Sequence, residues 1–498
     1  MTTIIKNIEK VIDHEACIMA YGHFTTIHPG HIRYLKHAKS LGNKLVIAVV
    51  GDQMIGDQPR YPFKQNERAE GLDLLGIADT IVLLESDNLT EAIKRLKPAI
   101  LVLGRELQGE SSLELPIKLL ESQGGSVQFH AGDVSYATAN LLVNNESELT
   151  HKRKIEFSAA CSRQGISKKD LINSIGKWSK TRLIVLGDTI LDQYAACEAL
   201  GMSAEAPVVV VKELAKRNFI GAAAVVAAHI KALGANVQLI SVTGDDENAN
   251  IIEQALRQQG IGNGLVRDPS RPTTFKKRYV VENQKLFRVS KLEQGNVDRQ
   301  VEDKLISKLE EIAPKTQGIV VSDFVYGVIT PRILETVEKL TRKYDLLLFG
   351  DIQCSSQIGS ITKFKNFTLL SPNERELRLA LQDKDSGIER LSQRILNESK
   401  CDKLIVKLAG EGFIAYDRSA NGKIVSQPFP ALSVNPVDVA GAGDSVLAVM
   451  ATGLASGQSM MNTSAIACCM AELAVETMGN TPISAESLKN NILGILSL

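Results

Sequence analysis

A short stretch near the C-terminal end, Asp438 to Ser445, carries the residue types that phosphoryl transfer needs. Its sequence, DVAGAGDS, crowds small residues before Asp444, and an apolar run follows at 446–450. This pattern predicts a tight turn that opens a helix, whose outward N–H groups form an anion site at the positive end of the helix dipole. A carboxylate at the end of such a turn is well placed to take a proton from an attacking hydroxyl, so we predict Asp444 as a catalytic base. An ordinary glycine-rich helix start would look the same.

Two histidines near the N-terminus form a second candidate site. Short apolar runs at 17–21 and 45–50 flank a helical pattern, which predicts a βαβ unit. In the loop after the first run, GHFTTIHPGH, His28 and His31 flank Pro29-Gly30 at a helix start. Imidazoles placed there can donate hydrogen bonds to the phosphates of a nucleotide. Metal binding and a pair of surface histidines are the alternatives, but no third zinc ligand is evident nearby.

Composition limits the class of protein. At 498 residues the chain should form two or three domains, and Lys+Arg and Asp+Glu balance at 57 each, which argues against nucleic-acid or membrane-surface binding. No targeting segment or bilayer-length apolar run is present, so we expect a cytoplasmic protein. The seven cysteines lack metal-ligand spacing, which favours buried, reduced thiols.

The remaining pattern predicts an α/β fold whose elements would position these residues. From residue 183 onward, apolar runs such as GIVVSDF and LLLFGD end in polar residues and alternate with helical runs. Repeated strands of this kind are typical of a doubly wound sheet with its site at one edge. Residues 146–180 are polar and helix-forming, so we predict a partly helical connector between a domain at 1–145 and a larger one at 181–498.

Residues 15–145 resemble the cytidylyltransferase-like nucleotidyltransferases, whose mark is G-x-F-D-x-x-H-x-G-H. The matching residues are Gly22, Phe24, His28, Gly30 and His31. The resemblance implies a Rossmann-like domain in which His28 and His31 are catalytic, while Arg68 and Thr138 help to hold phosphates. Thr25 and Leu103 stand where the family often has Asp and Lys, which leaves the nucleotide and the acceptor open.

Residues 166–498 resemble the ribokinase-like sugar kinases, through GDTILD, SAEAPVVVV, NERE, GEG and DVAGAGDS in that order. Within that group this half is most similar to the kinase half of the bifunctional ADP-heptose synthase family, which joins a heptose 7-phosphate kinase to a heptose 1-phosphate adenylyltransferase. In that family the kinase comes first, whereas here the order is reversed.

This second resemblance implies a role for each matching residue. Asp444 is the base; Gly441, Ala442 and Gly443 form the anion hole; Lys407 to Gly412, including Gly410 and Gly412, border the ATP site; Asp188, Asp192 and Gly221 bind the sugar; Asn373 and Glu376 hold Mg²⁺ through water. Ala222 and Val225 depart from the family's GGAAN element, whose Asn binds sugar hydroxyls, so either a different sugar is accepted or the kinase activity has decayed.

We therefore predict a bifunctional enzyme that phosphorylates a sugar or sugar phosphate with ATP and Mg²⁺ and then joins a nucleotide to a sugar 1-phosphate. Heptose and ATP are the expected substrates, and a homodimer through the kinase domain is the expected assembly. Two alternatives stay open. The N-terminal half could use CTP on a small polyol phosphate, or the second half could be a degenerate kinase that serves as a dimerisation or sensing module.

Overall fold

The computed structural model describes residues 3–5, 17–25, 27–52, 63–84, 89–104, 107–108, 110–129, 146–282, 284–353, 359–418 and 422–496. The chain divides into two compact units. The first contains residues 1–136 and 381–395, and the second contains residues 137–380 and 396–498. No helix of the described ranges is both long and apolar enough to span a membrane.

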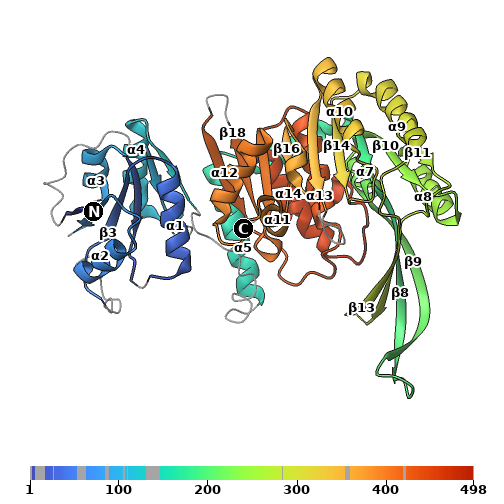
Figure 1. The fold of residues 1–498 in the computed structure, drawn as a ribbon, viewed down its shortest axis with the longest axis horizontal. Helices are drawn as coiled ribbons and strands as arrows, with labels where there is room; N and C mark the ends of the chain where they lie inside the picture. The colour runs from blue at the N-terminus through green and yellow to red at the C-terminus, as the bar shows by residue number, and fades with distance from the viewer. Residues whose placement is uncertain are drawn as a thin grey trace. The chain divides into compact units, whose positions relative to one another are not determined.

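The first unit is built on a six-stranded parallel sheet in the order β1-β4-β3-β2-β5-β6 (Figure 1). The strands are β1 (Thr3–Ile5), β2 (Ile18–Gly22), β3 (Leu45–Val50), β4 (Thr80–Leu84), β5 (Ile100–Val102) and β6 (Ser126–Gln128), and the helices are α1 (Pro29–Ser40), α2 (Gln65–Leu74), α3 (Leu89–Leu96) and α4 (Glu114–Ser122). The central strands β2 and β3 are buried on both faces, because alternate residues pack into two separate hydrophobic clusters. The predicted βαβ unit, β2-α1-β3, is confirmed.

The second unit contains a nine-stranded sheet in the order β11-β10-β7-β14-β15-β16-β17-β18-β19. Its strands are β7 (Arg182–Gly187), β10 (Asn236–Thr243), β11 (Gly262–Arg267), β14 (Gly318–Asp323), β15 (Leu347–Ile352), β16 (Leu369–Leu370), β17 (Lys403–Lys407), β18 (Phe413–Arg418) and β19 (Ile424–Phe429). All neighbours run parallel from β11 to β17, and only β18 and β19 are antiparallel. The parallel strands therefore end at one common edge, as the sequence predicts.

Apolar helices form the core beneath this sheet. The helices that follow β6 in the sequence are α5 (Glu146–Arg163), α6 (Lys168–Gly176), α7 (Ala223–Ala232), α8 (Glu247–Gln258), α9 (Arg299–Ile312), α10 (Pro331–Tyr344), α11 (Glu374–Leu381), α12 (Ile388–Ser399), α13 (Ala442–Ala455), α14 (Met460–Val475) and α15 (Ala485–Ile495). Most of α12 belongs to the first unit. Helices α7, α13 and α14 are rich in small and apolar residues and are buried along almost their whole length. Side chains of α5 and α6, together with Trp178, lie in the same hydrophobic cluster.

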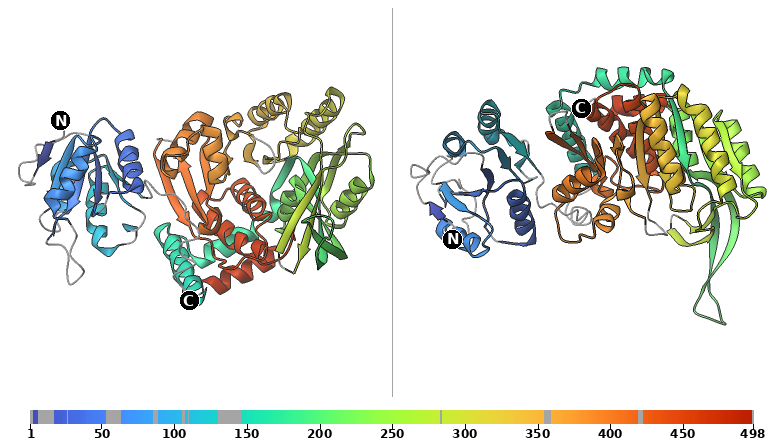
Figure 2. Two further views of the ribbon diagram at one scale, coloured as in Figure 1. Left: turned by 60° about the horizontal axis from the view of Figure 1, so that its bottom comes forward. Right: turned by 45° about the horizontal axis from the view of Figure 1, so that its top comes forward.

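A separate four-stranded sheet, in the order β13-β12-β8-β9, extends from the body of the second unit (Figures 1 and 2). Its strands are β8 (Thr189–Met202), β9 (Val209–Ala222), β12 (Phe275–Val281) and β13 (Gln284–Lys291). The start of β8 and the end of β9 are buried, whereas the far half of this long hairpin is exposed. The buried ends bring polar residues of this sheet close to the start of α13.

Candidate active sites

The predicted turn and helix at 438–445 are confirmed. Gly441 is the N-cap of α13 and has φ 81°, a conformation that favours glycine. A Cβ atom at this position would lie only 2.1 Å from Oδ1 of Asn480, so any other residue would also displace the Asn480 carboxamide. Asp444 follows in the first turn of the helix and is buried.

The Asp444 carboxyl lies in an environment that disfavours its charged form. Burial and the nearby Asp351 raise its pKa to about 8, although Lys407 and Lys276 oppose the shift. Its Oδ1 atom is buried and has no hydrogen-bond partner among the residues that the structure describes. A buried, unpaired acceptor is costly, so the site is arranged to receive a hydrogen-bond donor from another molecule.

Asp351 and Lys407 form a buried ion pair at the ends of β15 and β17. The Lys407 Nζ atom lies 2.9 Å from each carboxylate oxygen of Asp351. Burial raises the pKa of Asp351 to about 6, with Lys407 opposing the shift. Burial alone would lower the pKa of Lys407, but Asp351 and Glu376 outweigh it and hold that pKa above its ordinary value. The pair therefore places a charged ammonium beside Asp444.

Asn373 and Glu376 open α11 as a reciprocal capping pair. The Asn373 side chain accepts the N–H of Glu376, and the Glu376 carboxylate accepts the N–H of Asn373, each at 2.8 Å. The Asn373 backbone also pairs with that of Lys407, and Glu376 is buried. The structure thus brings this pair to the same strand ends as Asp351. Within the described part of the chain, no three carboxylate, imidazole or thiol groups gather to hold a metal by themselves.

Asp192 and Gly221 meet on the adjoining faces of β8 and β9. A Cβ on Gly221 would lie 3.1 Å from Oδ2 of Asp192 and 3.6 Å from Nδ2 of Asn480. Arg278 of β12 donates to Asp192 at 3.1 Å. Burial raises the pKa of Asp192, and Arg278 opposes that rise. Asp192 and Asp444 interact electrostatically, so they belong to one site.

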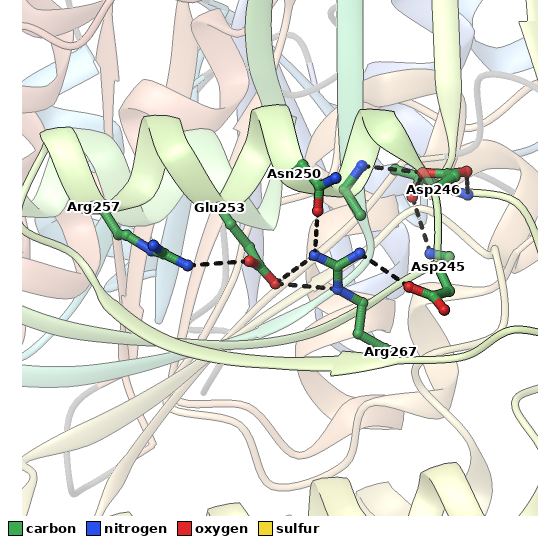
Figure 3. A network of polar contacts seen from close by, with 9 residues as sticks. Asp245, Asp246, Asn250, Glu253, Arg257 and Arg267 are labelled. Atoms are coloured by element: carbon green, nitrogen blue, oxygen red, sulfur yellow. Dashed lines mark hydrogen bonds and ion pairs between the residues drawn. The ribbon is translucent and has the colours of Figure 1, made fainter.

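A polar network fixes the start of β12, the strand that carries Lys276 and Arg278 (Figure 3). Asp246 caps α8 and accepts hydrogen bonds from both the N–H and the hydroxyl of Thr273. Beside it, Arg267 contacts Asp245 and Glu253. Because Thr273 lies just before β12, this network sets the position from which the strand enters the site.

Asp188 is engaged with the backbone. Its carboxylate accepts the N–H groups of Phe324, Tyr326 and Val328, and it is buried. Burial and the neighbouring Asp323 raise its pKa to about 7. The carboxylate thus organises the loop after β14. Gly410 and Gly412 lie between β17 and β18, and a Cβ on Gly412 would lie 2.1 Å from the Phe429 carbonyl oxygen.

The N-terminal candidate residues gather where β2 leads into α1. His28 is the N-cap of α1, and its Nδ1 atom accepts the N–H of Gly30 at 3.1 Å. The rings of His28 and His31 stack with centroids 4.0 Å apart, and Phe24 lies 5.2 Å from His31. Gly22 ends β2 directly before this loop. The two imidazoles therefore converge at one helix start.

Arg68 is buried at the ends of the neighbouring strands. Its guanidinium donates to the carbonyls of His23 and Val50 and to the Asp52 carboxylate. These bonds tie α2 to the loops that follow β2 and β3. Thr138, the other residue expected to hold phosphate, lies outside the described residues.

Sequence reasoning missed Asp351, Lys276, Arg278 and Asn480, and it placed Lys407 only at the border of the nucleotide site. Asp351 and Lys407 end parallel strands, so the common strand edge could have indicated both residues. Asn480 follows α14 and carries no such signal, because only the folded chain brings it between Gly221 and Gly441.

Comparisons with known proteins agree with this architecture. Residues 180–487 match the family described as pfkB family carbohydrate kinase, and residues 19–113 match the family described as cytidylyltransferase-like. Because the first match covers more than half of the sequence, the chain belongs to the pfkB family of carbohydrate kinases. Both resemblances noted in the sequence are thereby confirmed.

Among individual proteins, the chain is similar to two bacterial relatives that carry the same name. The chain is 32% identical over 314 residues to "Bifunctional protein HldE" of Geobacter sulfurreducens and 30% identical over 314 residues to that of Campylobacter jejuni subsp. doylei. These alignments cover 62% of this chain and 62% and 64% of the two relatives, so the chain matches less than two thirds of their length.

Solved structures support the fold of the second unit. Phosphofructokinase-2 from Escherichia coli, in complex with substrates and products, matches with a TM-score of 0.53 and 16% identity, covering 63% of this chain and 99% of that one. The same enzyme in complex with fructose-6-phosphate matches with a TM-score of 0.52 and 17% identity, covering 64% and 99%. Identities this low establish the shared fold alone.

Proposed function

We propose that the second unit is an ATP-dependent kinase that phosphorylates a hydroxyl of a sugar or sugar phosphate, with Asp444 as the base. The observation that carries this proposal is the buried Asp444 carboxyl at the start of α13, whose Oδ1 atom has no hydrogen-bond partner among the described residues. The turn before α13 would bind phosphate through its N–H groups. Asp192 and Arg278, on the other side of Asp444, would bind the sugar hydroxyl. Membership of the pfkB family supports the same reaction.

Mg²⁺ fits this site through Asn373 and Glu376. One oxygen of each side chain already accepts a backbone N–H, so we infer that the pair reaches the ion through bound water and not by direct ligation. When bound, the ion would neutralise charge on the nucleotide phosphates. The residues of the chain would orient the phosphates and receive the hydroxyl proton.

The first unit is proposed to transfer a nucleotidyl group to a sugar 1-phosphate and to release pyrophosphate. The stacked His28 and His31 rings at the start of α1 support this role, because two imidazoles and helix-start N–H groups can bind one phosphate together. Gly22 and Gly30 would border the nucleotide, and Arg68 would act by holding the surrounding loops. We expect ATP as the nucleotide, with CTP as the alternative.

A heptose phosphate is the proposed sugar, on the resemblance to the ADP-heptose synthase family and the similarity to proteins named HldE. Assembly as a homodimer and a cytoplasmic location remain predictions. Val225 favours a second candidate, a kinase-like module without activity, because this residue is fully buried in α7 and cannot contact a sugar. Asn480 argues against that candidate, since its carboxamide lies beside Gly221 and can contact the acceptor in its place.

The two proposed activities can be separated on the full-length chain with two variants. Asp444→Asn should abolish ADP release from ATP and a panel of hexose and heptose phosphates while leaving pyrophosphate release unchanged. His28→Ala/His31→Ala should do the reverse, because the two sets of residues belong to different units. Both products are followed in the same assay with ATP and with CTP.

In the wild type, kinase kcat/KM should rise with pH, reach half of its maximum near pH 8 and level off about one pH unit higher, because the base acts as a carboxylate and its pKa is about 8. Retention of ADP release by Asp444→Asn would contradict the base assignment. Absence of ADP release from the wild type with every sugar would favour the inactive module.

A further inference from the structure

An ammonium group, that of Lys407, lies beside the N–H groups at the start of α13. A Cβ atom on Gly443, in the first helical turn, would lie 3.2 Å from Nζ of Lys407 and 3.6 Å from Nε2 of Gln353. Gly443 lies directly before Asp444. The turn predicted to hold phosphate therefore lies beside a positive charge, the ammonium group of Lys407 at the end of β17.

Asp351 holds that charge in place. It contacts the Lys407 Nζ with both oxygens at 2.9 Å, and its own side chain is 1% exposed. A buried ion pair contributes little net stability compared with apolar side chains, because both charges lose their hydration. A structural role alone therefore gives a weak account of this pair, whereas an incoming phosphate would give the ammonium a second anionic partner.

We propose that Lys407 is a further catalytic residue of the kinase unit, which binds the terminal phosphates of ATP and neutralises the charge on the phosphoryl group during its transfer. Asp351 is the positioning residue that holds Lys407 in place. This inference rests on the proposed kinase function and deepens it.

The reaction step can be written with all its atoms. The acceptor hydroxyl oxygen forms a bond to the γ-phosphorus, and the bond from that phosphorus to the bridging β,γ oxygen breaks. ADP leaves with the electron pair, and the hydroxyl proton passes to Asp444. Lys407 forms no covalent bond; it stabilises negative charge on the phosphate oxygens as they move.

Lys407→Gln tests this role in the full-length chain, with ADP release from ATP and the sugar phosphate panel as the assay. We expect kcat to fall about 100-fold or more, as for the loss of one transition-state donor. The KM for ATP should rise, while the inhibition constant of AMP stays unchanged because AMP lacks the β- and γ-phosphates. The acid limb of the kinase pH profile should also move to higher pH, since Lys407 lowers the pKa of Asp444.

A double variant separates catalysis from folding. Asp351→Asn/Lys407→Gln removes both buried charges, so it leaves no unpaired charge even if the single variant fails to fold. If Lys407 acts on phosphate, the double variant stays impaired in kcat and in the KM for ATP, with the AMP constant unchanged. If Lys407 only neutralises Asp351, the double variant returns to nearly wild-type kinetics, and the inference is overturned.

Lys403→Gln is the matched control, because Lys403 lies on the same strand and is paired with Asp417 at 2.8 Å, away from the cluster. It should keep wild-type kinetics. An equal rise in the AMP and ATP constants of Lys407→Gln would also overturn the inference. A wild-type chain that releases no ADP with any sugar would instead overturn the proposed kinase function, which is a distinct outcome.

Discussion

Ala222 departs from ordinary backbone geometry. It is buried at the N-cap of α7 with φ 59° and ψ −134°, a region that glycine adopts readily and alanine does not. It also follows Gly221, where the Asp192 and Asn480 side chains approach. The strain therefore lies next to the proposed sugar site.

Ala222→Gly should raise the free energy of unfolding of the second unit by about 1 kcal/mol, because glycine removes the strain at this φ. Ala223→Gly, one residue later in ordinary helical conformation, should lower it by about 1 kcal/mol and serves as the control. Urea unfolding followed by the fluorescence of Trp178, the only tryptophan and a core residue of this unit, measures both. Equal destabilisation by the two changes would contradict the strain.

Prediction from sequence succeeded for local structure at the two motifs. The DVAGAGDS stretch specifies its own turn and helix, and the HPGH loop specifies the start of α1. Asn480 and Arg278 could not be predicted, because their place in the site depends on how α14 and the four-stranded sheet pack against distant segments.

Asp438 connects the four-stranded sheet, which carries the proposed sugar-binding residues, to the turn before α13. Its buried carboxylate accepts hydrogen bonds from Tyr194 of β8 at 2.7 Å and from Lys285 of β13, and it also accepts the N–H groups of Ala440 and Gly479. Burial would raise its pKa, but Lys285, the Ala440 N–H and Tyr194 outweigh burial and hold that pKa below its ordinary value. The four-stranded sheet is thus anchored to the turn that precedes α13.

Lys285→Gln removes the bond from Lys285 to Asp438 and so leaves the turn before α13 less firmly positioned. Because this turn contacts the transition state, the kinase kcat should fall about tenfold. Its effect on the free energy of unfolding should stay below about 1 kcal/mol, because Lys285 is more than one third exposed. Kinetics and urea unfolding on the same preparation measure both quantities.

Lys277→Gln is the control for this change, since Lys277 lies in the neighbouring strand β12 and pairs with Glu213 instead. A similar loss of kcat in the control would show that any disturbance of the sheet has this effect, and the anchoring role of Asp438 would be wrong.

At the level of elements, six parallel strands of the nine-stranded sheet were predictable, because each belongs to a short apolar run that ends in polar residues. They are β7, β10, β14, β15, β16 and β17. The projecting sheet was not. Strand β13 is exposed along its whole length, so its residues lack the buried face that produces an alternating pattern. The strand order of this sheet depends on β12, which pairs with β13 on one side and with β8 on the other. Strands β8 and β12 are distant from one another in the sequence.

At the level of the whole molecule, raised carboxyl pKa values should make the unliganded chain less stable as pH rises. The carboxyls of Asp444, Asp351 and Asp188, with pKa values of about 8, 6 and 7, keep their protons in the folded state at pH values where the unfolded chain has lost them. Folding therefore binds protons, so raising the pH from 5 to 8 favours unfolding.

Asp444→Asn should consequently stabilise the chain, and the gain should grow by up to about 1 kcal/mol per pH unit between pH 5 and 8. Trp178 fluorescence during urea unfolding at several pH values measures the difference. Asp268→Asn is a control of opposite sign, because bonds from Ser270 and Arg271 outweigh the effect of burial and lower the pKa of Asp268. That variant should be less stable than the wild type by an amount that stays constant across this pH range.

Both family resemblances could be found from the sequence because each rests on several motifs in order. The division into two compact units with their own sheets agrees with that picture. The packing of helices α5 and α6 into the core of the second unit could not be predicted. Their sequences are polar overall, and only a few side chains, such as Phe157 and Leu171, enter the core.

That packing has a practical consequence for anyone who wishes to produce the second unit alone. A fragment cut at residue 181 would lose Phe157, Leu171 and Trp178, and with them one wall of its hydrophobic interior. The apolar surface exposed by this cut would promote aggregation during expression. A workable truncation must therefore begin ahead of Glu146, where α5 starts.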